Sequence, residues 1–360
     1  MAKTWYPLLD VFRVLAAFAV MMGHFRTALF PAYSNLPSKG IIPAVFYFVT
    51  SLGHSAVIVF FVLSGFLVGG GICKNIKNGT FSLSDFALNR TVRIFLPLWG
   101  AIGLFSCFAW FGVPVPFGDA FLNALCLQVF LVPPLLGPYW ALPIEVLFYV
   151  LIGASACVWT YYGWRRYVSG MVMVLALALF YKIGLAYLVV FLLGMLVAFH
   201  TSREWSAWKF LLSCGICLGT LLLAQRITNY KVGDMLFGFG FAMLVRESIC
   251  FSPKTVFHKL LEPFSFVSRF SYSIYIIHMI VLVVLANFLF TTSKDCPMTD
   301  VRYFNLNGPG KIECFNELTV RTFILWLIAV MAAFAVSWLF YEVVEKRTKN
   351  VVSFVKRIIH

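Results

Sequence analysis

An arginine and a histidine inside one long apolar run are residues whose types and spacing could do chemistry. His24 follows Arg13 by eleven residues, and both lie in the run 7–29. In a helix that spacing is three turns plus about 20°, so both side chains share one face, about 16 Å apart along the axis. Asp10 lies three residues before Arg13 and can pair with it. Such a histidine can serve as a base near neutral pH, although a structural ion pair beside a helix-packing histidine also fits this pattern.

Further apolar runs carry polar residues at matching depths. Glu145 is expected near the depth of His24, where a carboxylate could orient an imidazole and raise its basicity. His278 and Ser64 are both expected near the middle of the membrane, and Gly65 permits close approach of another backbone. Helix packing explains Ser64 equally simply, and a hydrogen-bonded core residue explains His278.

Two arginines complete this set of polar residues. Arg90 and Arg93 lie three residues apart where another apolar run begins, so they share one face at its inner mouth. Their planar guanidinium groups suit the phosphates of a nucleotide-like donor, although such arginines are also ordinary flanks of a membrane span. Together these residues predict a polar file that leads from inner arginines to an outer histidine–carboxylate pair.

Composition shows what kind of protein must position these groups. Of 360 residues 61% are apolar and 12% are charged, and the mean hydropathy is +0.90. A soluble globule cannot cover so much apolar surface with so few charges. The net charge of +14 then marks loops on the cytoplasmic side of a bilayer and no nucleic-acid partner. The composition therefore predicts a polytopic membrane protein and excludes disordered and fibrous classes.

The apolar runs predict an all-α fold of about ten transmembrane helices. A bilayer core of about 30 Å needs roughly 20 residues per span. We expect one domain over 1–360, with a long outer loop at 293–318 and no cleaved signal at the N-terminus. The segment 118–134 holds Asp119, Asn123 and Gln128 and is better explained as a short re-entrant helix. The expected spans are 7–29, 41–72, 91–112, 139–160, 167–182, 184–201, 208–225, 231–248, 269–292 and 319–347.

Loop charges predict the orientation. With ten spans and the N-terminus inside, 18 of the 28 Lys and Arg residues fall on the inner side and 9 on the outer side, while Arg13 lies within the membrane. This bias places both termini in the cytoplasm.

Five segments, taken in chain order, form a set of motifs. They are Leu9-Asp10-Val11-Phe12-Arg13 with His24, Gly53-His54-Ser55-Ala56-Val57 leading into 60–66, Asn89-Arg90-Thr91-Val92-Arg93-Ile94 with Pro97-Leu98-Trp99, Trp140-Ala141-Leu142-Pro143-Ile144-Glu145 with Phe148-Tyr149, and Ser271-Tyr272-Ser273-Ile274-Tyr275-Ile276-Ile277-His278. This set resembles the motifs of the membrane-bound acyltransferase family 3, and the resemblance extends over essentially the whole chain. It departs from the family pattern at Pro143, where a polar residue is often found, and at Val14, where glycine is common.

The resemblance implies transfer of an acyl group, usually acetyl from cytoplasmic acetyl-CoA, to a hydroxyl of a surface glycan. The acceptor would be an O-antigen, exopolysaccharide or similar glycan, free or lipid-linked, at the outer face of the bacterial inner membrane. We expect His24, Arg13 and Glu145 to be catalytic, with His24 as base or as covalent carrier of the acyl group. We expect Arg90, Arg93, Ser64 and His278 to bind the donor, and no metal to take part.

A secondary transporter or lipid-linked sugar translocase is the main alternative. Such a protein should show internal repeats, paired broken helices and coupling carboxylates at the midplane. The chain has no repeat, and Glu145 is the convincing intramembrane carboxylate besides Asp10. A purely structural scaffold does not explain the polar file.

The cysteines give one further prediction. Cys296 and Cys314 share the long outer loop, where an oxidising periplasm would favour a disulfide, although two free thiols fit as well. Cys214 and Cys217 have redox or metal spacing, but they lie in a membrane helix without a second ligand pair and are better explained as small buried residues.

Overall fold

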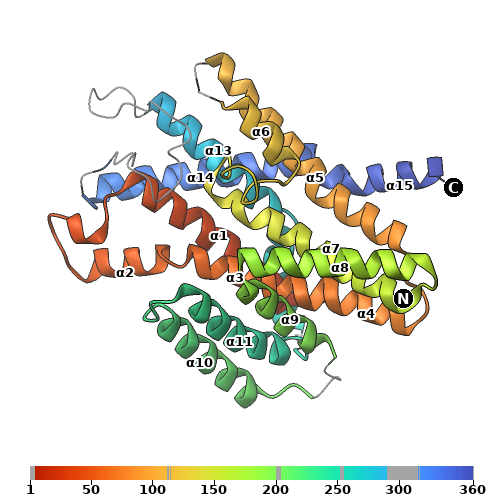
Figure 1. Cartoon of the computed structure of the whole chain (residues 1–360). Coiled ribbons are helices and arrows are strands. Elements are labelled where there is room, and N and C mark those ends of the chain that lie inside the picture. The colour runs from red at the N-terminus through yellow and green to blue at the C-terminus, as the bar shows by residue number, and fades with distance from the viewer. Residues whose placement is uncertain are drawn as a thin grey trace. The chain divides into compact units, whose positions relative to one another are not determined.

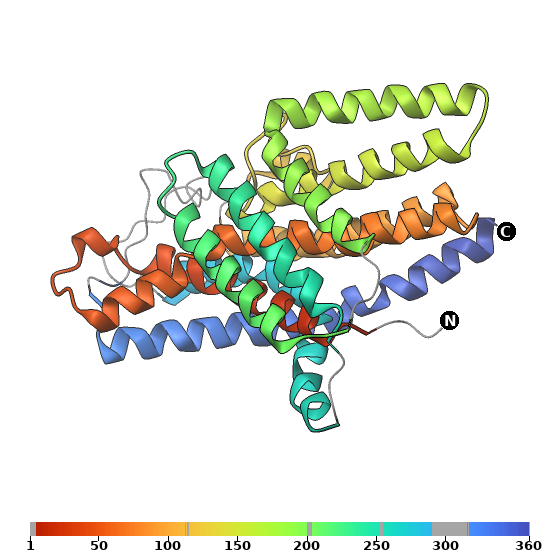
Figure 2. The same ribbon diagram turned by 90° about the horizontal axis from the view of Figure 1, so that it is seen from below.

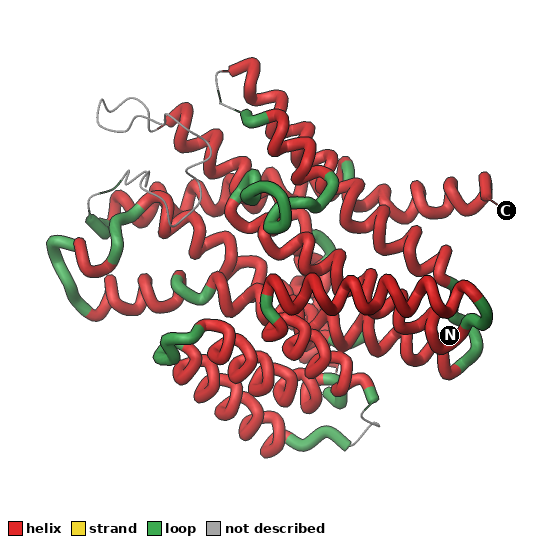
Figure 3. The backbone as a smooth tube through the Cα atoms, in the orientation of Figure 1, coloured by secondary structure: helices red, strands yellow, loops and turns green. Residues whose placement is uncertain are grey.

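The chain folds almost entirely into helices. The computed structural model describes residues 5–111, 113, 115–199, 204–251, 255–289, 315 and 317–359. Within these ranges there is no strand, and an isolated bridge joins Gln128 to Val132 (Figure 3). A helix satisfies its backbone hydrogen bonds internally, as a lipid environment requires. The all-α class is therefore confirmed. The predicted disulfide between Cys296 and Cys314 lies outside the described residues.

The described residues contain fewer than ten helical stretches that could span a membrane. Seven stretches are long and apolar enough to cross a bilayer, and the broken pair Lys259–Ser268 and Ser271–Ala286 can count as an eighth. The seven stretches are Pro7–Asn35, Ile41–Lys77, Leu83–Phe111, Gly137–Thr160, Trp164–Ile183, Ala207–Ala224 and Val320–Ile358. The chain is thus a multi-pass membrane protein, with seven or eight candidate spans among its described residues.

Two expected spans fall short for different physical reasons. The helix α9 (Leu185–Ala198) has 14 residues, which is about 21 Å and less than the hydrocarbon thickness. The helix α11 (Tyr230–Ser248) is long enough, but it carries Lys231, Asp234, Arg246 and Glu247. Sequence inspection therefore found both helices but overestimated their ability to span.

Two compact units share the chain. The first contains Met1–Ala16, His54–Ala87 and Ile144–Arg269, and the second contains Ala17–Gly53, Leu88–Pro143 and Phe270–His360. Because each is assembled from three separate segments, neither is a continuous stretch of sequence. The helices α1 (Pro7–Leu29), α3 (Gly53–Ser64), α5 (Leu83–Cys107) and α7 (Ala141–Thr160) contribute residues to both.

The first unit contains a π-helical segment against which α4 (Gly70–Lys77) and α9 pack. Its elements include η2 (Gly65–Gly69), α8 (Trp164–Ile183), α10 (Ala207–Ala224) and α12 (Thr255–Ser268), in addition to α4, α9 and α11. The helices α10 and α11 pack side by side, as Figures 1 and 2 both show, and α11 packs in turn against α9. The helix α9 then packs on η2.

Glycines allow α9 to approach η2 closely. A Cβ added at Gly65 would lie 1.9 Å from the Phe191 carbonyl oxygen, and one added at Gly194 would lie 2.0 Å from the Val62 oxygen. Backbone cannot move aside as a flexible side chain can, so these positions require glycine. This confirms the expectation that Gly65 permits a close backbone approach.

The second unit holds the remaining helices. Its elements include η1 (Tyr33–Asn35), α2 (Ile41–Thr50), η3 (Phe108–Phe111), α6 (Phe117–Ala124), η4 (Gly137–Trp140), α13 (Ser271–Leu289), α14 (Val320–Val343), η6 (Glu345–Arg347) and α15 (Thr348–Ile359). The helix α13 packs against both α14 and η4.

The expected re-entrant helix is shorter than the segment 118–134. Its helical part, α6, ends at Ala124, and turns follow. The buried Asn123 side chain accepts a hydrogen bond from the Leu135 amide at 2.8 Å and donates to the Pro133 carbonyl at 3.2 Å. Val129 has a φ of 73°, which is a costly backbone conformation for a β-branched residue. Side-chain bonds therefore hold a turn that local propensity disfavours.

We expect both termini and the loops around Lys77, Arg203 and Lys259 to face the cytoplasm. This follows from the loop charges counted over ten spans. Eight spans keep both termini, Lys77 and Lys259 on one side, but the loop around Arg203 then follows five crossings and shares that side only if α9 and α11 cross as well. Reporter fusions, or labelling of introduced cysteines from each side, would measure it. Labelling of the 293–318 loop from the cytoplasm alone would contradict the orientation.

Candidate active site

A pair of histidines lies at the centre of the second unit. The Nδ1 atom of His24, on α1, lies 3.0 Å from the Nε2 atom of His278, on α13. The two rings stack with centroids 5.1 Å apart and an interplanar angle of 25°. His278 is fully buried, whereas His24 is half-buried. The His278 imidazole thus holds the His24 imidazole through this hydrogen bond.

The hydrogen bonds of this pair define the tautomer of each ring. The Nδ1 atom of His278 lies 2.7 Å from the Ile274 carbonyl, which can only accept, so Nδ1 carries the proton. In a neutral imidazole Nε2 is then an acceptor, and His24 must donate to it from Nδ1. This leaves the lone pair of His24 on Nε2, which is the arrangement required of a general base.

Two tyrosines fix α13 to the turn before α7. The Tyr139 hydroxyl donates to the Ile276 carbonyl at 2.9 Å, and the Tyr275 hydroxyl donates to the Pro138 carbonyl. The Tyr275 ring also contacts the His278 ring. The turn is held in place by Gln128, whose amide donates to the Tyr139 carbonyl at 3.0 Å. These bonds hold the backbone that carries His278.

The arginine motif of α5 faces a half-buried carboxylate. The Arg93 guanidinium acts electrostatically on Glu345, which also accepts hydrogen bonds from the Ser273 hydroxyl at 2.5 Å and amide at 3.1 Å. The Tyr272 hydroxyl donates to the Ile94 carbonyl at 3.1 Å, so the start of α13 is also bonded to α5. Arg93 remains exposed and Arg90 half-buried. The part of α5 that carries the two arginines is therefore fixed to α13, and the Arg93 guanidinium stays accessible.

Arg13 belongs to a polar cluster in the first unit. Its guanidinium lies 3.6 Å from the Asp10 carboxylate, which confirms the pair expected from their spacing. The same carboxylate accepts bonds from Ser265 at 2.6 Å, Ser268 at 2.9 Å and the Trp5 indole at 3.0 Å. Asp10 thus joins the start of α1 to α12.

Glu145 and Ser64 also belong to the first unit. The Glu145 carboxylate accepts a bond from the Tyr149 hydroxyl at 2.5 Å, one turn further along α7. The Ser64 hydroxyl oxygen is buried and has no hydrogen-bond partner among the described residues. It lies where α3 passes into the π-helix η2, and π-helical segments are frequent at functional sites.

The predicted site residues are therefore divided between the two units. His24, His278, Arg90 and Arg93 belong to the second unit, and Arg13, Ser64 and Glu145 belong to the first. The partner found against the His24 ring is His278, while the expected contact with Glu145 stays a prediction. Both ring nitrogens of His278 are engaged, which favours a positioning role over direct contact with the donor.

Sequence inspection missed two carboxylates, of which one is buried and one half-buried. Asp234 on α11 is 6% exposed, and its oxygens lie 2.9 and 3.0 Å from the His54 Nε2 atom. Glu345 bonds Ser273. The statement that Glu145 is the convincing carboxylate besides Asp10 is therefore incomplete. Their signal was present, since each acidic residue stands within an expected apolar span.

Comparison with known proteins agrees with the resemblance of the motifs. A family model for an acyltransferase domain matches residues 6–342, which is nearly the whole chain. The search of curated proteins and the search of solved structures found no match to this chain. The match includes both units and all seven candidate site residues. The chain belongs to acyltransferase family 3.

Proposed function

We propose that this acyltransferase moves an acetyl group from acetyl-CoA to a hydroxyl of a cell-surface glycan, at the outer face of the bacterial inner membrane. His24 would be the base. The observation that carries the proposal is the bonded series Ile274–His278–His24, which leaves the Nε2 lone pair of a half-buried imidazole available.

The chemistry needs only groups that this chain provides. The His24 Nε2 atom takes the proton of the acceptor hydroxyl as its oxygen attacks the thioester carbonyl. The carbon–sulfur bond then breaks, and the imidazolium returns the proton to the leaving thiolate. Atoms and charge balance without a redox partner: thioester and alcohol become ester and thiol.

His278 would act as a positioning residue. Since the Ile274 carbonyl fixes its tautomer, it holds the proton of His24 on Nδ1 and prevents the ring from turning. Arg13 and Glu145 would support turnover from the first unit, and Ser64, with its unpartnered hydroxyl, is a candidate to contact the donor.

The donor would be held by the arginine motif. Arg90 and Arg93 offer several planar donors to phosphate oxygens. The Glu345 carboxylate attracts the Arg93 guanidinium, which stays exposed. This arrangement supports acyl-CoA as donor.

The test is transfer by purified protein in lipid nanodiscs. Radiolabelled acetyl-CoA is supplied with polysaccharide or its lipid-linked precursor from a strain that lacks the gene, and mass spectrometry locates the ester. Incorporation of label that requires both substrates is expected. Glycan from cells with the gene should carry the same ester. Incorporation from a longer acyl-CoA in preference to acetyl-CoA would contradict the proposed donor.

Loss of the arginines should weaken donor binding. Arg90→Ala and Arg93→Ala are each expected to raise KM for acetyl-CoA about 10–100-fold, because a charged hydrogen bond contributes about 1.5–3 kcal/mol. The effect should shrink as salt is added, since exposed charges are screened. Steady-state kinetics in nanodiscs measure it.

Arg357→Ala is the matched control. Arg357 is an exposed arginine of α15, so its loss removes the same charge elsewhere in the same unit. An unchanged KM in both motif variants, or an equal rise in the control, would count against a donor site at Arg90 and Arg93.

A further inference from the structure

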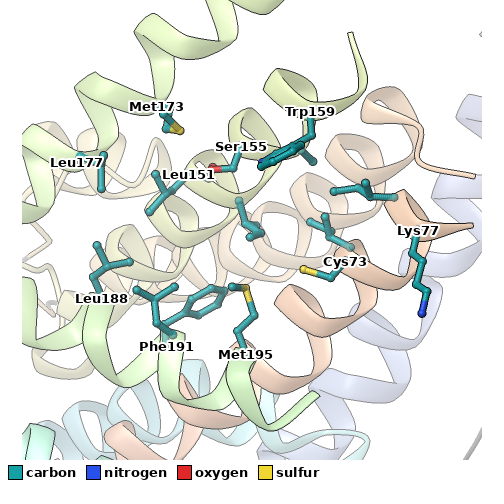
Figure 4. Close-up of a pocket in the computed structure, with 15 residues that line it drawn as sticks. Cys73, Lys77, Leu151, Ser155, Trp159, Met173, Leu177, Leu188, Phe191 and Met195 are labelled. Carbon is teal, nitrogen blue, oxygen red and sulfur yellow. The ribbon is translucent and has the colours of Figure 1, made fainter. Parts of the chain in front are cut away.

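The first unit contains an apolar cavity apart from the residues discussed so far. It lies between α4, α7, α8 and α9 and has a volume of about 470 Å³ (Figure 4). Binding sites for small molecules have volumes of about 300–1,000 Å³, so this is a cavity of ligand size.

The lining of the cavity excludes a polar ligand. It is built mainly from Leu, Ile, Met, Phe and Trp side chains of the four helices. The hydroxyl of Ser155, which faces the cavity in Figure 4, is already used because it donates to the Leu151 carbonyl at 2.8 Å. A polar molecule would lose its hydrogen bonds with water here and find few in exchange. An alkyl chain would lose none.

One end of the cavity has the character of a membrane interface. Lys77 is the last residue of α4, and Trp159 stands one residue before the end of α7. Both line the cavity, and Trp159 is 80% exposed. Trp and Lys typically stand at the level of lipid headgroups. In Figure 4 Lys77 lies at one end, and Leu177 and Leu188 lie toward the other.

We propose that the cavity holds one acyl chain of an anionic phospholipid, with the lipid phosphate at Lys77. Lys77 supplies an ammonium group to the lining at this end, and Lys74 adds a second positive charge in the last turn of the same helix. The residues that line the cavity include no carboxylate. From Leu151 to Trp159 the lining extends about 12 Å along α7, which accommodates most of one leaflet's acyl chain.

The bound chain would support the segment that follows Ser64. Phe191 and Met195 line the cavity and also form the surface that Gly65 and Gly69 touch. An acyl chain against these two residues therefore packs α9 onto η2 from behind. The lipid is thus expected to stabilise the protein as well as to bind it.

The experiment is native mass spectrometry of the purified protein with added phosphatidylglycerol or phosphatidylethanolamine of identical acyl chains. The wild type should retain one phosphatidylglycerol at concentrations where phosphatidylethanolamine is washed away. Ser155→Phe, which fills the cavity, should reduce binding of both lipids at least tenfold. Lys77→Ala should lower binding of phosphatidylglycerol about fivefold, the effect of one basic residue at an anionic surface, and leave phosphatidylethanolamine unchanged.

Two variants serve as matched controls. Leu175→Phe adds a ring to an exposed position of α8 that does not line the cavity, and Lys209→Ala removes an exposed lysine of α10. Both should bind lipid as the wild type does. Equal losses in the controls would show ordinary annular lipid and overturn the proposal, as would full binding by folded Ser155→Phe.

A third arm distinguishes the source of the acyl chain. Palmitoyl-CoA at equal concentration should fail to displace phosphatidylglycerol; if it does displace it, the cavity belongs to an acyl donor and the proposal is wrong. Should Ser155→Phe fail to fold, the lipid preference of Lys77→Ala decides alone, because an exposed lysine can be removed without disturbing the packing. A preference unchanged in Lys77→Ala would overturn the assignment of the headgroup.

Discussion

His24→Ala is expected to abolish acyl transfer while leaving the protein inserted and able to bind acetyl-CoA. Removal of a general base typically costs about 10²–10⁴-fold in rate, and loss of a covalent carrier should cost more. The imidazole that contacts the His24 ring is His278, and both of its nitrogens bond their neighbours, so it is not placed to replace the base. Product formation by folded protein in nanodiscs measures the effect. Near-normal turnover by His24→Ala would end the hypothesis.

Variants of His278 separate positioning from packing. His278→Gln keeps a side-chain acceptor for His24 and should retain part of the activity, whereas His278→Leu should lower kcat strongly with little change in the KM for acetyl-CoA. A positioning role also predicts that the pH profile of kcat changes in His278→Gln. His54→Gln is the matched control, since it alters an imidazole bonded to Asp234 in the other unit.

Arg13→Ala and Glu145→Ala should also cripple turnover without preventing insertion.

Gly65→Ala should destabilise the protein severely. The new methyl carbon would lie 1.9 Å from the Phe191 carbonyl oxygen, well inside van der Waals contact. Overpacking usually costs about 1–3 kcal/mol, and here the obstacle is backbone, which cannot adopt another rotamer. We expect a loss of folded protein and of activity. Gly194→Ala should behave alike, because its methyl carbon would lie 2.0 Å from the Val62 oxygen. Thermal unfolding in detergent, followed by fluorescence, measures both.

Gly71→Ala provides the comparison for this prediction. It lies in the adjoining helix α4, and nothing stands within 4 Å of an added Cβ there. It should unfold at or above the wild-type temperature, since alanine favours helix over glycine. Equal stability of Gly65→Ala and Gly71→Ala would show that α9 and η2 do not pack as described.

Local patterns account for most of the fold. The apolar run predicts a helix over about 7–29, as observed, and helical spacing alone predicts the pair of Asp10 and Arg13. The number of spans is predicted less well. Apolar composition alone does not show that the helix α9 is too short to cross the bilayer or that α11 carries too many charges. Depth within a run indicated which polar residues could matter, and their roles stay predictions.

Partners across the fold could not be predicted in the same way. The bond between His24 and His278 joins residues 254 positions apart, and it depends on how two helices are rotated about their axes. Helix rotation is set by packing against neighbours, which no periodicity in one helix reports. For the same reason the sequence suggested a carboxylate for His24, and the structure places an imidazole there.

The reach of these bonds has a consequence for biosynthesis. Asp10 accepts a hydrogen bond from Ser268, which is 258 residues later, and His24 bonds His278, which is 254 residues later. At about 5–20 residues per second, a ribosome needs roughly 10–50 s to make the intervening chain. During that interval the first helix lies in the membrane with Asp10 paired to Arg13 but without its two serine partners, and with His24 without His278. Chains truncated before α12 and α13 should therefore be less stable in the membrane than the full chain.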